Sequence, residues 1–506
     1  MSLLRSMFPA SGVPDRFLAF WKALGQVLPE LPADPPPGKT PPALPAPDFE
    51  EPVLRSLVNL IGEEALATDP ETLTRHACGL GYRGFLLRQV GAALPLAVVY
   101  PESEAQITAL MLWAAGRELR LRPWGGGSAI TPLPTASPAY LVLDLSRLHH
   151  LQRLDAQNGQ VTVQAGLRWE ALEQALHAQG LTTGVGFWTA ESTVGGRLAT
   201  LGWPFAYLDG GLLARVLAVR GITPAGPLTL TRPMAGAPDA RSLLLGQGGA
   251  WGVITEATLR ITFLPENRLT AEIDLPDWET GIALMRRLGQ QIPWTWARLT
   301  PLLAWGLFTP QLPTQWRLPF SLLRDQGRAD WVRLSLGWTG RGEVTALIRR
   351  ELEHLLKQEY PEANSTFHSG DFQELFWFPR WLERSRLWEH GLLFTPLEAL
   401  VSWNRVAPFL RDWERALLSI AQTRLGNAWV ASTVHAVFEG ALVRSFLLAY
   451  PVDQEAEALL AHLDTVEAAA QAVRQRWALP FLADKLLQAI WQQTAEYLDP
   501  EGVWVR

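Results

Sequence analysis

Residues 122–130 read RPWGGGSAI, and the three consecutive glycines directly follow ELRLRP, a stretch typical of a β-strand. Glycine tolerates close approach and unusual backbone angles, so three in a row indicate a loop that another group approaches closely. A Rossmann loop would need G-x-G-x-x-G opening a helix, and a Walker loop would need GK[ST]. Neither pattern is present here, which leaves an ordinary loop or a nest of backbone N–H groups around an anion such as a diphosphate.

Two further glycine loops follow, STVGGRLAT at residues 192–200 and LGQGGAWGVITEATLRI at residues 245–261. Regular elements separate the three loops, and the last one runs directly into a strand-like segment. We therefore expect the three loops to hold one extended ligand together.

The segments between the loops predict strands alternating with helices. A helix is expected at residues 103–118, beginning near Glu102 or Ser103, and another at 168–180, closed by Gly180. Strands are predicted by the apolar and β-branched stretches at residues 94–101, 118–123, 139–148 and 161–166. This arrangement predicts an α+β fold with helices packed on mixed sheets.

Composition limits the possible function classes. A chain of 506 residues is too long for one core, so we expect several domains. The net charge of −6, without a block of Lys or Arg, argues against nucleic-acid binding. Cys78 is the only cysteine, which excludes an intramolecular disulfide and a thiolate metal cluster and agrees with a cytoplasmic setting. The 23 tryptophans either fill cores or line a broad apolar cavity.

The N-terminal region predicts an appended helix. Residues 16–28 carry apolar side chains at helical spacing, and residues 29–48 form a proline-rich, partly extended linker. The helix could dock on its own protein, on a partner or on a membrane surface, although its charge is too sparse to favour a membrane. We find no signal-peptide core in MSLLRSMFPASG and no apolar run of 18 residues.

Five motifs in order make the sequence resemble the FAD-linked oxidases with a vanillyl-alcohol-oxidase (PCMH) type of FAD domain. The segments that carry the resemblance lie between residues 85 and 265: PLAVVYPESEAQITALM, RPWGGGSAI, LVLDLSRLHHLQRLDAQNGQVTVQAGLRWEALEQAL, STVGGRLAT and GQGGAWGVITEATLRI. Within this group the chain is most similar to the alkyldihydroxyacetonephosphate synthases, through RGFLLRQVGAALPLAVVYP, GLTTGVGFWTAESTVGG, WLERSRLWEHGLLFTPLEALVSWNRV and AEYLDPEGVW.

The resemblance implies FAD as the cofactor, held by three loops. Loop 1 (residues 123–129) would hold the diphosphate, and loop 2 (191–200) and loop 3 (245–254) would hold the flavin and the rest. FAD should be noncovalent because the loops contain no His or Cys, and no metal site is expected. The implied cofactor-binding residues are Pro123, Trp124, Gly125, Gly126, Gly127, Ser128 and Ala129; Glu191, Ser192, Thr193, Gly195 and Gly196; and Gly246, Gln247, Gly248, Gly249, Gly252 and Ile254.

The sequence departs from the family at bulky positions near the cofactor. Trp251 stands where the family has a small aliphatic residue, and Trp203, Pro204 and Phe205 replace a small, Gly/Ser-containing stretch. Such bulk could fill part of the FAD groove or reshape it.

The catalytic region departs as well. The synthases use a tyrosine as acid or base, but the matching position here is Val437, or Phe438 if one residue is deleted, and neither moves a proton. The histidine run of the synthases is also missing. His435, two residues away on the same predicted strand face, is the remaining acid/base candidate, although a lone strand His is often structural. Arg384 matches a substrate-binding arginine and could clamp a carboxylate or phosphate, or could be an exposed helix charge. We interpret His149 and His150 as surface residues.

Five regions are therefore expected: residues 1–48 as helix and linker, 49–90 as a helical lead-in, 91–265 as the FAD-binding domain, 266–460 as a substrate cap with an antiparallel sheet and flanking helices, and 461–506 as helices returning to the FAD domain. Three functions stay open: an FAD-dependent oxidoreductase acting on a small hydroxy acid or alcohol, a synthase-like transferase in ether-lipid synthesis, and a non-catalytic binding protein on a degenerate flavin fold. We expect a small-molecule substrate, no nucleic acid, a homodimer and a cytoplasmic location, with peripheral membrane contact left open.

Overall fold

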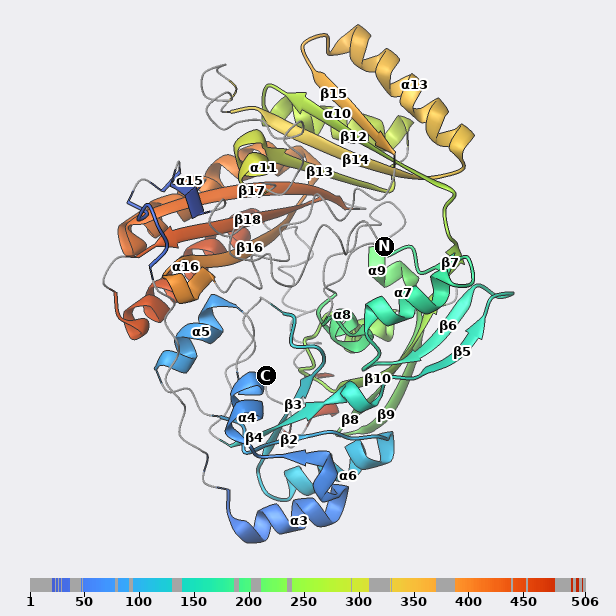
Figure 1. Ribbon diagram of the computed structural model, residues 1–506, viewed down its shortest axis with the longest axis vertical. Coiled ribbons are helices and arrows are strands. Elements are labelled where there is room, and N and C mark those ends of the chain that lie inside the picture. The colour runs from blue at the N-terminus through green and yellow to red at the C-terminus, as the bar shows by residue number, and fades with distance from the viewer. Residues whose placement is uncertain are drawn as a thin grey trace. The chain divides into compact units, whose positions relative to one another are not determined.

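The chain divides into two compact units (Figure 1). The cap unit consists of Met1–Thr40 and Pro265–Leu482, and the glycine-loop unit consists of Pro41–Leu264 and Ala483–Arg506. The computed structural model describes residues 21–22, 24–25, 27–28, 30–36, 47, 49–77, 81–90, 94–129, 139–185, 191–201, 211–233, 239–292, 294–308, 328, 330–369, 387–437, 440–451, 454–477, 493–494, 497–499 and 503.

The first half of the glycine-loop unit is a four-stranded sheet in the order β1-β2-β4-β3. Its strands are β1 (Leu66–Ala67), β2 (Ala97–Val99), β3 (Arg120–Trp124) and β4 (Tyr140–Asp144), and β2, β4 and β3 run parallel. The accompanying helices are α3 (Glu51–Ile61), α4 (Pro70–Ala77), α5 (Tyr82–Gln89) and α6 (Glu104–Ala115). Ser103 caps α6 by accepting a hydrogen bond from the Gln106 N–H, as the sequence predicts.

The second half of the unit is an antiparallel five-stranded sheet in the order β5-β6-β10-β8-β9. The strands are β5 (Leu151–Asp155), β6 (Gln160–Gln164), β8 (Val216–Thr223), β9 (Gly226–Thr231) and β10 (Val253–Arg260). Helices α7 (Trp169–His177), α8 (Val194–Thr200) and α9 (Gly211–Arg215) accompany it, and β7 (Leu181–Thr182) pairs with β11 (Thr262–Phe263). One hydrophobic core includes Leu141 and Leu143 of the first sheet and Val161, Val219 and Leu259 of the second.

The cap unit contains a seven-stranded antiparallel sheet in the order β15-β12-β14-β13-β17-β18-β16. Its strands are β12 (Asn267–Leu275), β13 (Trp296–Pro301), β14 (Val332–Gly340), β15 (Asn364–Ser369), β16 (Leu393–Val401), β17 (Asn427–Val437) and β18 (Gly440–Tyr450). Its helices are α10 (Trp278–Gln291), α11 (Leu302–Phe308), α13 (Gly342–Glu359), α15 (Val406–Leu425) and α16 (Ala456–Trp477). Helices α10, α13 and α15 pack on the sheet (Figure 1). Short 3-10 segments lie at Glu63–Ala65, Leu145–Arg147, Ala240–Leu243, Leu387–His390 and Trp403–Arg405.

The described N-terminal residues dock on their own chain. Trp21, Leu24 and Leu28 are buried in a cluster with Phe446 and Leu448 of β18. The Trp21 indole N–H donates to the carbonyl oxygen of Pro32 at 2.7 Å. Of the three docking surfaces considered for this segment, the structure shows the first.

The α+β fold and the antiparallel cap sheet are confirmed. One boundary differs from the expectation, because α16 belongs to the cap unit and only Ala483–Arg506 fall in the glycine-loop unit. The reason is packing: α16 buries Leu459, Leu463 and Val466, and it contacts α15 and β16 of the cap. Among the described residues, no helix is both long and apolar enough to cross a bilayer.

Candidate functional site

Loop 1 lies directly against loop 2. A Cβ atom on Gly125 would meet the Thr193 hydroxyl and lie 3.3 Å from the Cα of Gly196. A Cβ atom on Gly126 would lie within a covalent-bond length of the Glu191 carbonyl oxygen. The glycine run was expected to accommodate a bound anion, but at these two positions the closest group is loop 2 itself, the Thr193 side chain at Gly125 and the Glu191 backbone at Gly126.

Loop 2 is fixed in place by backbone hydrogen bonds. The Trp169 N–H donates to Ser192 O at 2.8 Å, and the Gly195 N–H donates to Ala165 O at 2.7 Å. Thr193 caps α8, because its side chain accepts from the Gly196 N–H at 3.2 Å. Loop 2 therefore presents a rigid surface to loop 1.

Loop 3 contacts both of the other loops. The Gly246 N–H donates to Leu198 O at 3.0 Å and the Gly248 N–H donates to Ala199 O at 2.7 Å, both at the end of α8. Gly249 has a left-handed φ of 85°, and a Cβ there would lie 3.0 Å from the Pro123 ring of loop 1. The three glycine loops, although far apart in the sequence, thus contact one another within the glycine-loop unit.

Two predicted cofactor residues at the end of loop 3 have a structural role. A Cβ on Gly252 would lie 2.6 Å from Ile222 O, so the β8 backbone requires this glycine. Ile254 is buried in β10 and its backbone pairs with Gly221.

Backbone N–H groups of loop 1 are available to an anion. Among the described residues, the N–H groups of residues 125–129 have no protein acceptor, and the segment is partly exposed. By contrast, the N–H groups of Val194, Gly195 and Gly196 are all used within the protein. Loop 1, and not the α8 terminus, therefore supplies the donors suited to a diphosphate.

A buried polar pair that no local sequence pattern indicates supports loop 1. The Trp124 ring is buried, and the His76 ring packs against it with 4.9 Å between centroids. His76 contacts Asp144 Oδ2 at 3.0 Å through Nε2 and Thr72 O at 2.8 Å through Nδ1. Trp124 can therefore offer a cofactor only its backbone, because its ring belongs to this core.

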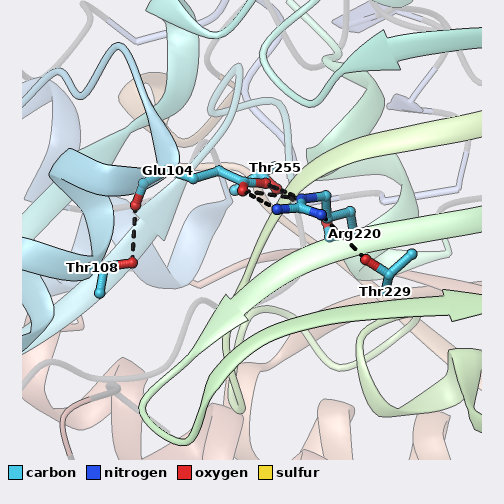
Figure 2. Close-up of polar contacts among 5 residues, drawn as sticks. All are labelled: Glu104, Thr108, Arg220, Thr229 and Thr255. Atoms are coloured by element: carbon cyan, nitrogen blue, oxygen red, sulfur yellow. Dashed lines mark hydrogen bonds and ion pairs between the residues drawn. The ribbon is translucent and has the colours of Figure 1, made fainter.

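A second polar cluster joins helix α6 to the five-stranded sheet (Figure 2). The Arg220 guanidinium of β8 forms a bidentate pair with Glu104 of α6, with Nε–Oε1 and Nη2–Oε2 distances of 2.7 Å. The Thr255 hydroxyl donates to Glu104 at 2.6 Å. The hydrogen bonds from Arg220 lower the pKa of Glu104, so this carboxylate is ionised at neutral pH. The cluster therefore clamps α6 to β8 and β10.

The bulky Trp251 packs into a small apolar cluster with Leu498, Leu228 and Leu243. Its ring is therefore accommodated by the C-terminal segment and β9. Trp203, Pro204 and Phe205 lie outside the described residues.

The cap sheet carries a buried polar surface on the face opposite α10 and α15. Leu299 and Val332 lie next to Gly281 of α10, and Ser445 bonds to Trp413 of α15, so these three side chains point toward the helices. Because side chains alternate along a strand, the residues directly before and after them point to the opposite face of the sheet. We call this surface the polar face; its members are the buried residues Glu272, Asp274, Arg298, Thr300, Arg333, Ser335, Thr433, His435 and Arg444, and the partly exposed Glu398. In the strand register, Glu272 pairs with Ser335, Ser335 with Arg298, and Arg298 with His435.

His435, the predicted acid/base candidate, is 1% exposed at the centre of the polar face. Its Nε2 is 2.9 Å from the Thr433 hydroxyl. Burial, followed by Arg298 and Arg444, holds the pKa of His435 well below its usual value, so the ring is neutral at pH 7. Arg384, Val437's side chain and Phe438 lie outside the described residues, so the structure does not bring Arg384 and His435 together.

The class of protein that the glycine-loop unit resembles follows from comparisons with known proteins, and it is the class of flavin-dinucleotide-binding proteins. Residues 95–231 match the family model of the FAD binding domain. In sequence, this chain is 29% identical to the uncharacterised FAD-linked oxidoreductase YgcU of Escherichia coli over 47% of this chain and 50% of YgcU. It is 31% identical to D-2-hydroxyglutarate dehydrogenase of Xanthomonas citri pv. viticola over 37% of this chain and 40% of that protein.

The alkyldihydroxyacetonephosphate synthase of Caenorhabditis elegans is 28% identical over 39% of this chain and 35% of that protein. The matched region thus spans half or less of these curated relatives. A solved alkyldihydroxyacetonephosphate synthase has a TM-score of 0.79 at 17% identity, covering 96% of this chain and 92% of that chain. p-Cresol methylhydroxylase has a TM-score of 0.66 at 12% identity, covering 91% and 97%. Residues 95–231 therefore match an FAD binding domain, and the chain shares its fold with these two solved structures.

Proposed function

We propose that this protein is an FAD-dependent oxidoreductase that holds FAD noncovalently at the three glycine loops and oxidises a small hydroxy acid or alcohol. The observation that carries the proposal is the meeting of loops 1, 2 and 3, together with the N–H groups of residues 125–129, which have no acceptor among the described residues. These donors suit a diphosphate, and Gly125 and Gly126 keep loop 1 against its rigid neighbour. Relatives named D-2-hydroxyglutarate dehydrogenase and D-lactate dehydrogenase support the substrate class.

The chemistry divides between cofactor and chain. Bound FAD would supply the electron acceptor. The polar face would bind and orient the substrate, because arginines bind carboxylates and the neutral imidazole of His435 can accept a proton. Burial of these groups excludes water, which strengthens their interactions with a charged substrate.

The test begins with the visible spectrum of the purified protein. FAD should be present near one per chain, should be released intact by acid or heat, and should bleach when a substrate hydroxy acid is added without oxygen. Candidate substrates are D-lactate, D-2-hydroxyglutarate and glycolate. A protein that is colourless and takes up no added FAD would instead support the non-catalytic alternative.

The synthase-like transferase is the second candidate, favoured by a fold overlap that covers 96% of this chain. Activity with an acyl-dihydroxyacetone phosphate and a long-chain alcohol, without bleaching, would support it over oxidation. The absence of an ionisable side chain at both Val437 and Phe438 argues against it.

We further propose that the protein acts as a homodimer in the cytoplasm. Its acidic balance and single cysteine support this setting. Light scattering of the purified protein tests the dimer, and fractionation of cells tests the location, with a membrane pellet as the opposing result.

A further inference from the structure

Glu272 is the most deeply buried carboxyl group of the polar face. Its side chain lies on β12 and the residue is 2% exposed. The Ser335 hydroxyl donates to Glu272 Oε2 at 2.8 Å, and Arg333 Nε lies 3.8 Å from the same oxygen. Among the described residues, the other oxygen, Oε1, has no hydrogen-bond partner. Oε2 of this buried carboxyl group therefore accepts a hydrogen bond, whereas Oε1 makes none.

Burial favours the neutral form of Glu272, and the neighbouring arginines only partly oppose it. Arg333 is already engaged by Asp274, with Nε–Oδ1 and Nη2–Oδ2 distances of 2.6 and 2.9 Å. Burial, opposed by Arg333, Ser335 and Arg298 and assisted slightly by Asp274, raises the pKa of Glu272 to about 7. Because Oε2 accepts from Ser335, the proton of the neutral acid lies on Oε1.

We propose that the Glu272 carboxyl group donates a hydrogen bond from Oε1 to an anionic oxygen of the substrate, which is a carboxylate or a phosphate bound on the polar face. The inference rests on the proposed function for its substrate class. A buried O–H without an acceptor is costly, so a ligand oxygen placed there satisfies the acid. Arg298, which pairs with Ser335 across the strands, adds positive charge beside the same position.

The other titratable side chains that face this region are two arginines, one aspartate and two histidines. Arg298 and Arg333 stay cationic, and Asp274 forms a bidentate pair with Arg333. His368 of β15 and His435 of β17 both have lowered pKa values, through burial first and then through Arg333 for His368 and through Arg298 and Arg444 for His435. The proton on Glu272 is therefore the one that binding should follow between pH 6 and pH 8.5.

Calorimetric binding of two redox-inert anions to the purified holoprotein tests the proposal. Oxalate represents a carboxylate and sulfate a phosphate, and neither titrates between pH 6 and pH 8.5. At least one should bind at pH 6, with an affinity that falls about tenfold per pH unit above pH 7 as the competent form is depleted. The anion that binds identifies which of the two oxygen sources the site takes.

Three variants make the result specific. Glu272→Gln retains an N–H donor, so it should bind at pH 6 and lose the pH dependence. Glu272→Leu removes the donor and should weaken binding about tenfold or more at pH 6. Glu414→Gln is the control: Glu414 on α15 has a raised pKa from burial, but it is bonded to Ser432 on the opposite face of the sheet. This control should bind as the unaltered protein does.

Two results overturn the inference: neither anion binds, or binding is the same in Glu272→Leu as in the unaltered protein. FAD content, read from the visible spectrum of the same samples, separates this failure from failure of the proposed function. Protein that holds FAD but binds no anion refutes the role of Glu272 alone. Colourless protein whose anion binding depends on Glu272 refutes the flavin function and leaves this site standing.

Discussion

Replacing Gly126 with alanine should separate loop 1 from loop 2 and abolish FAD uptake. The added methyl group would fall within a covalent-bond length of the Glu191 carbonyl oxygen, whereas non-bonded atoms need about 3.5 Å. One of the loops must therefore move by roughly 2 Å. Loop 2 is held by the hydrogen bonds Trp169 N–Ser192 O, Val194 N–Leu167 O and Gly195 N–Ala165 O, at 2.8, 2.9 and 2.7 Å.

The expected cost follows from those bonds. At about 1 kcal/mol for each, losing all three destabilises the glycine-loop unit by on the order of 3 kcal/mol. For a domain of this size, that corresponds to a fall in Tm of roughly 6–12 °C. Calorimetry measures the Tm, and the absorbance ratio of flavin to protein measures FAD occupancy.

Two controls separate the close contact from general effects of alanine. Gly248 of loop 3 has open space for an added Cβ but a left-handed φ of 63°, so Gly248→Ala should cost about 1 kcal/mol in stability, well below the cost at Gly126, and its FAD occupancy tests the predicted role of Gly248 in binding. Gly340 at the end of β14 also has open space, without a left-handed φ, so Gly340→Ala should change neither property. Full FAD occupancy and an unchanged Tm in Gly126→Ala would refute the contact between the loops.

Three further predictions concern stability. Glu104→Gln should cost about 1–2 kcal/mol of unfolding free energy at pH 7, measured by denaturant titration. Its difference from the unaltered protein should shrink below pH 4.5, because the lowered pKa of Glu104 stabilises the fold only while the carboxylate is ionised. The control is Arg55→Ala, which removes the exposed Arg55–Glu51 ion pair and should not change stability; an equal loss in both variants would contradict the clamp. Glu272→Leu should be more stable than the unaltered protein by on the order of 3 kcal/mol above pH 7. The gain should develop between pH 4.5 and 7, because the raised pKa of Glu272 means that the unaltered protein releases a proton on unfolding in this range. A stability difference that does not change with pH would contradict the raised pKa. Trp21→Ala should cost about 3 kcal/mol and expose the proline-rich segment to limited proteolysis, and an unaltered digestion pattern would argue against docking on the cap sheet.

Local signals predicted much of the fold. The apolar spacing of residues 103–118 and the position of Ser103 predicted α6 and its cap, and Gly180 with its left-handed φ of 69° follows α7 as expected. The three glycine loops were located for the same reason, because glycine is a strong signal wherever the backbone must approach another group. What each glycine contacts depends on tertiary structure, so the approach of Gly126 to Glu191 could not be inferred from spacing.

The remaining features depend on strand register and on long-range packing. His76 and Asp144 are 68 residues apart, and no local pattern pairs them. The polar face was present in the sequence as alternation in LTAEIDL, WARLTP and VRLSLGW, with polar residues at every second position. Only the pairing of β12, β14 and β13 shows that these positions form one surface. The placement of α16 in the cap likewise follows from its contacts with α15, which its amphipathic pattern does not specify.

The passage of the chain between the units at residues 40/41, 264/265 and 482/483 has a consequence for how this protein is made. The N–H of Leu121 in β3 bonds to the carbonyl oxygen of Val503 at 2.7 Å, so the strand that leads into loop 1 is completed by a segment synthesised almost 400 residues later. During translation, the glycine-loop unit therefore cannot complete its folding until the whole cap sheet has been synthesised. A stop codon placed after the cap should yield a finished cap beside an unfinished cofactor site, and a fragment ending at Leu264 should need residues 483–506 added in trans before it can assemble.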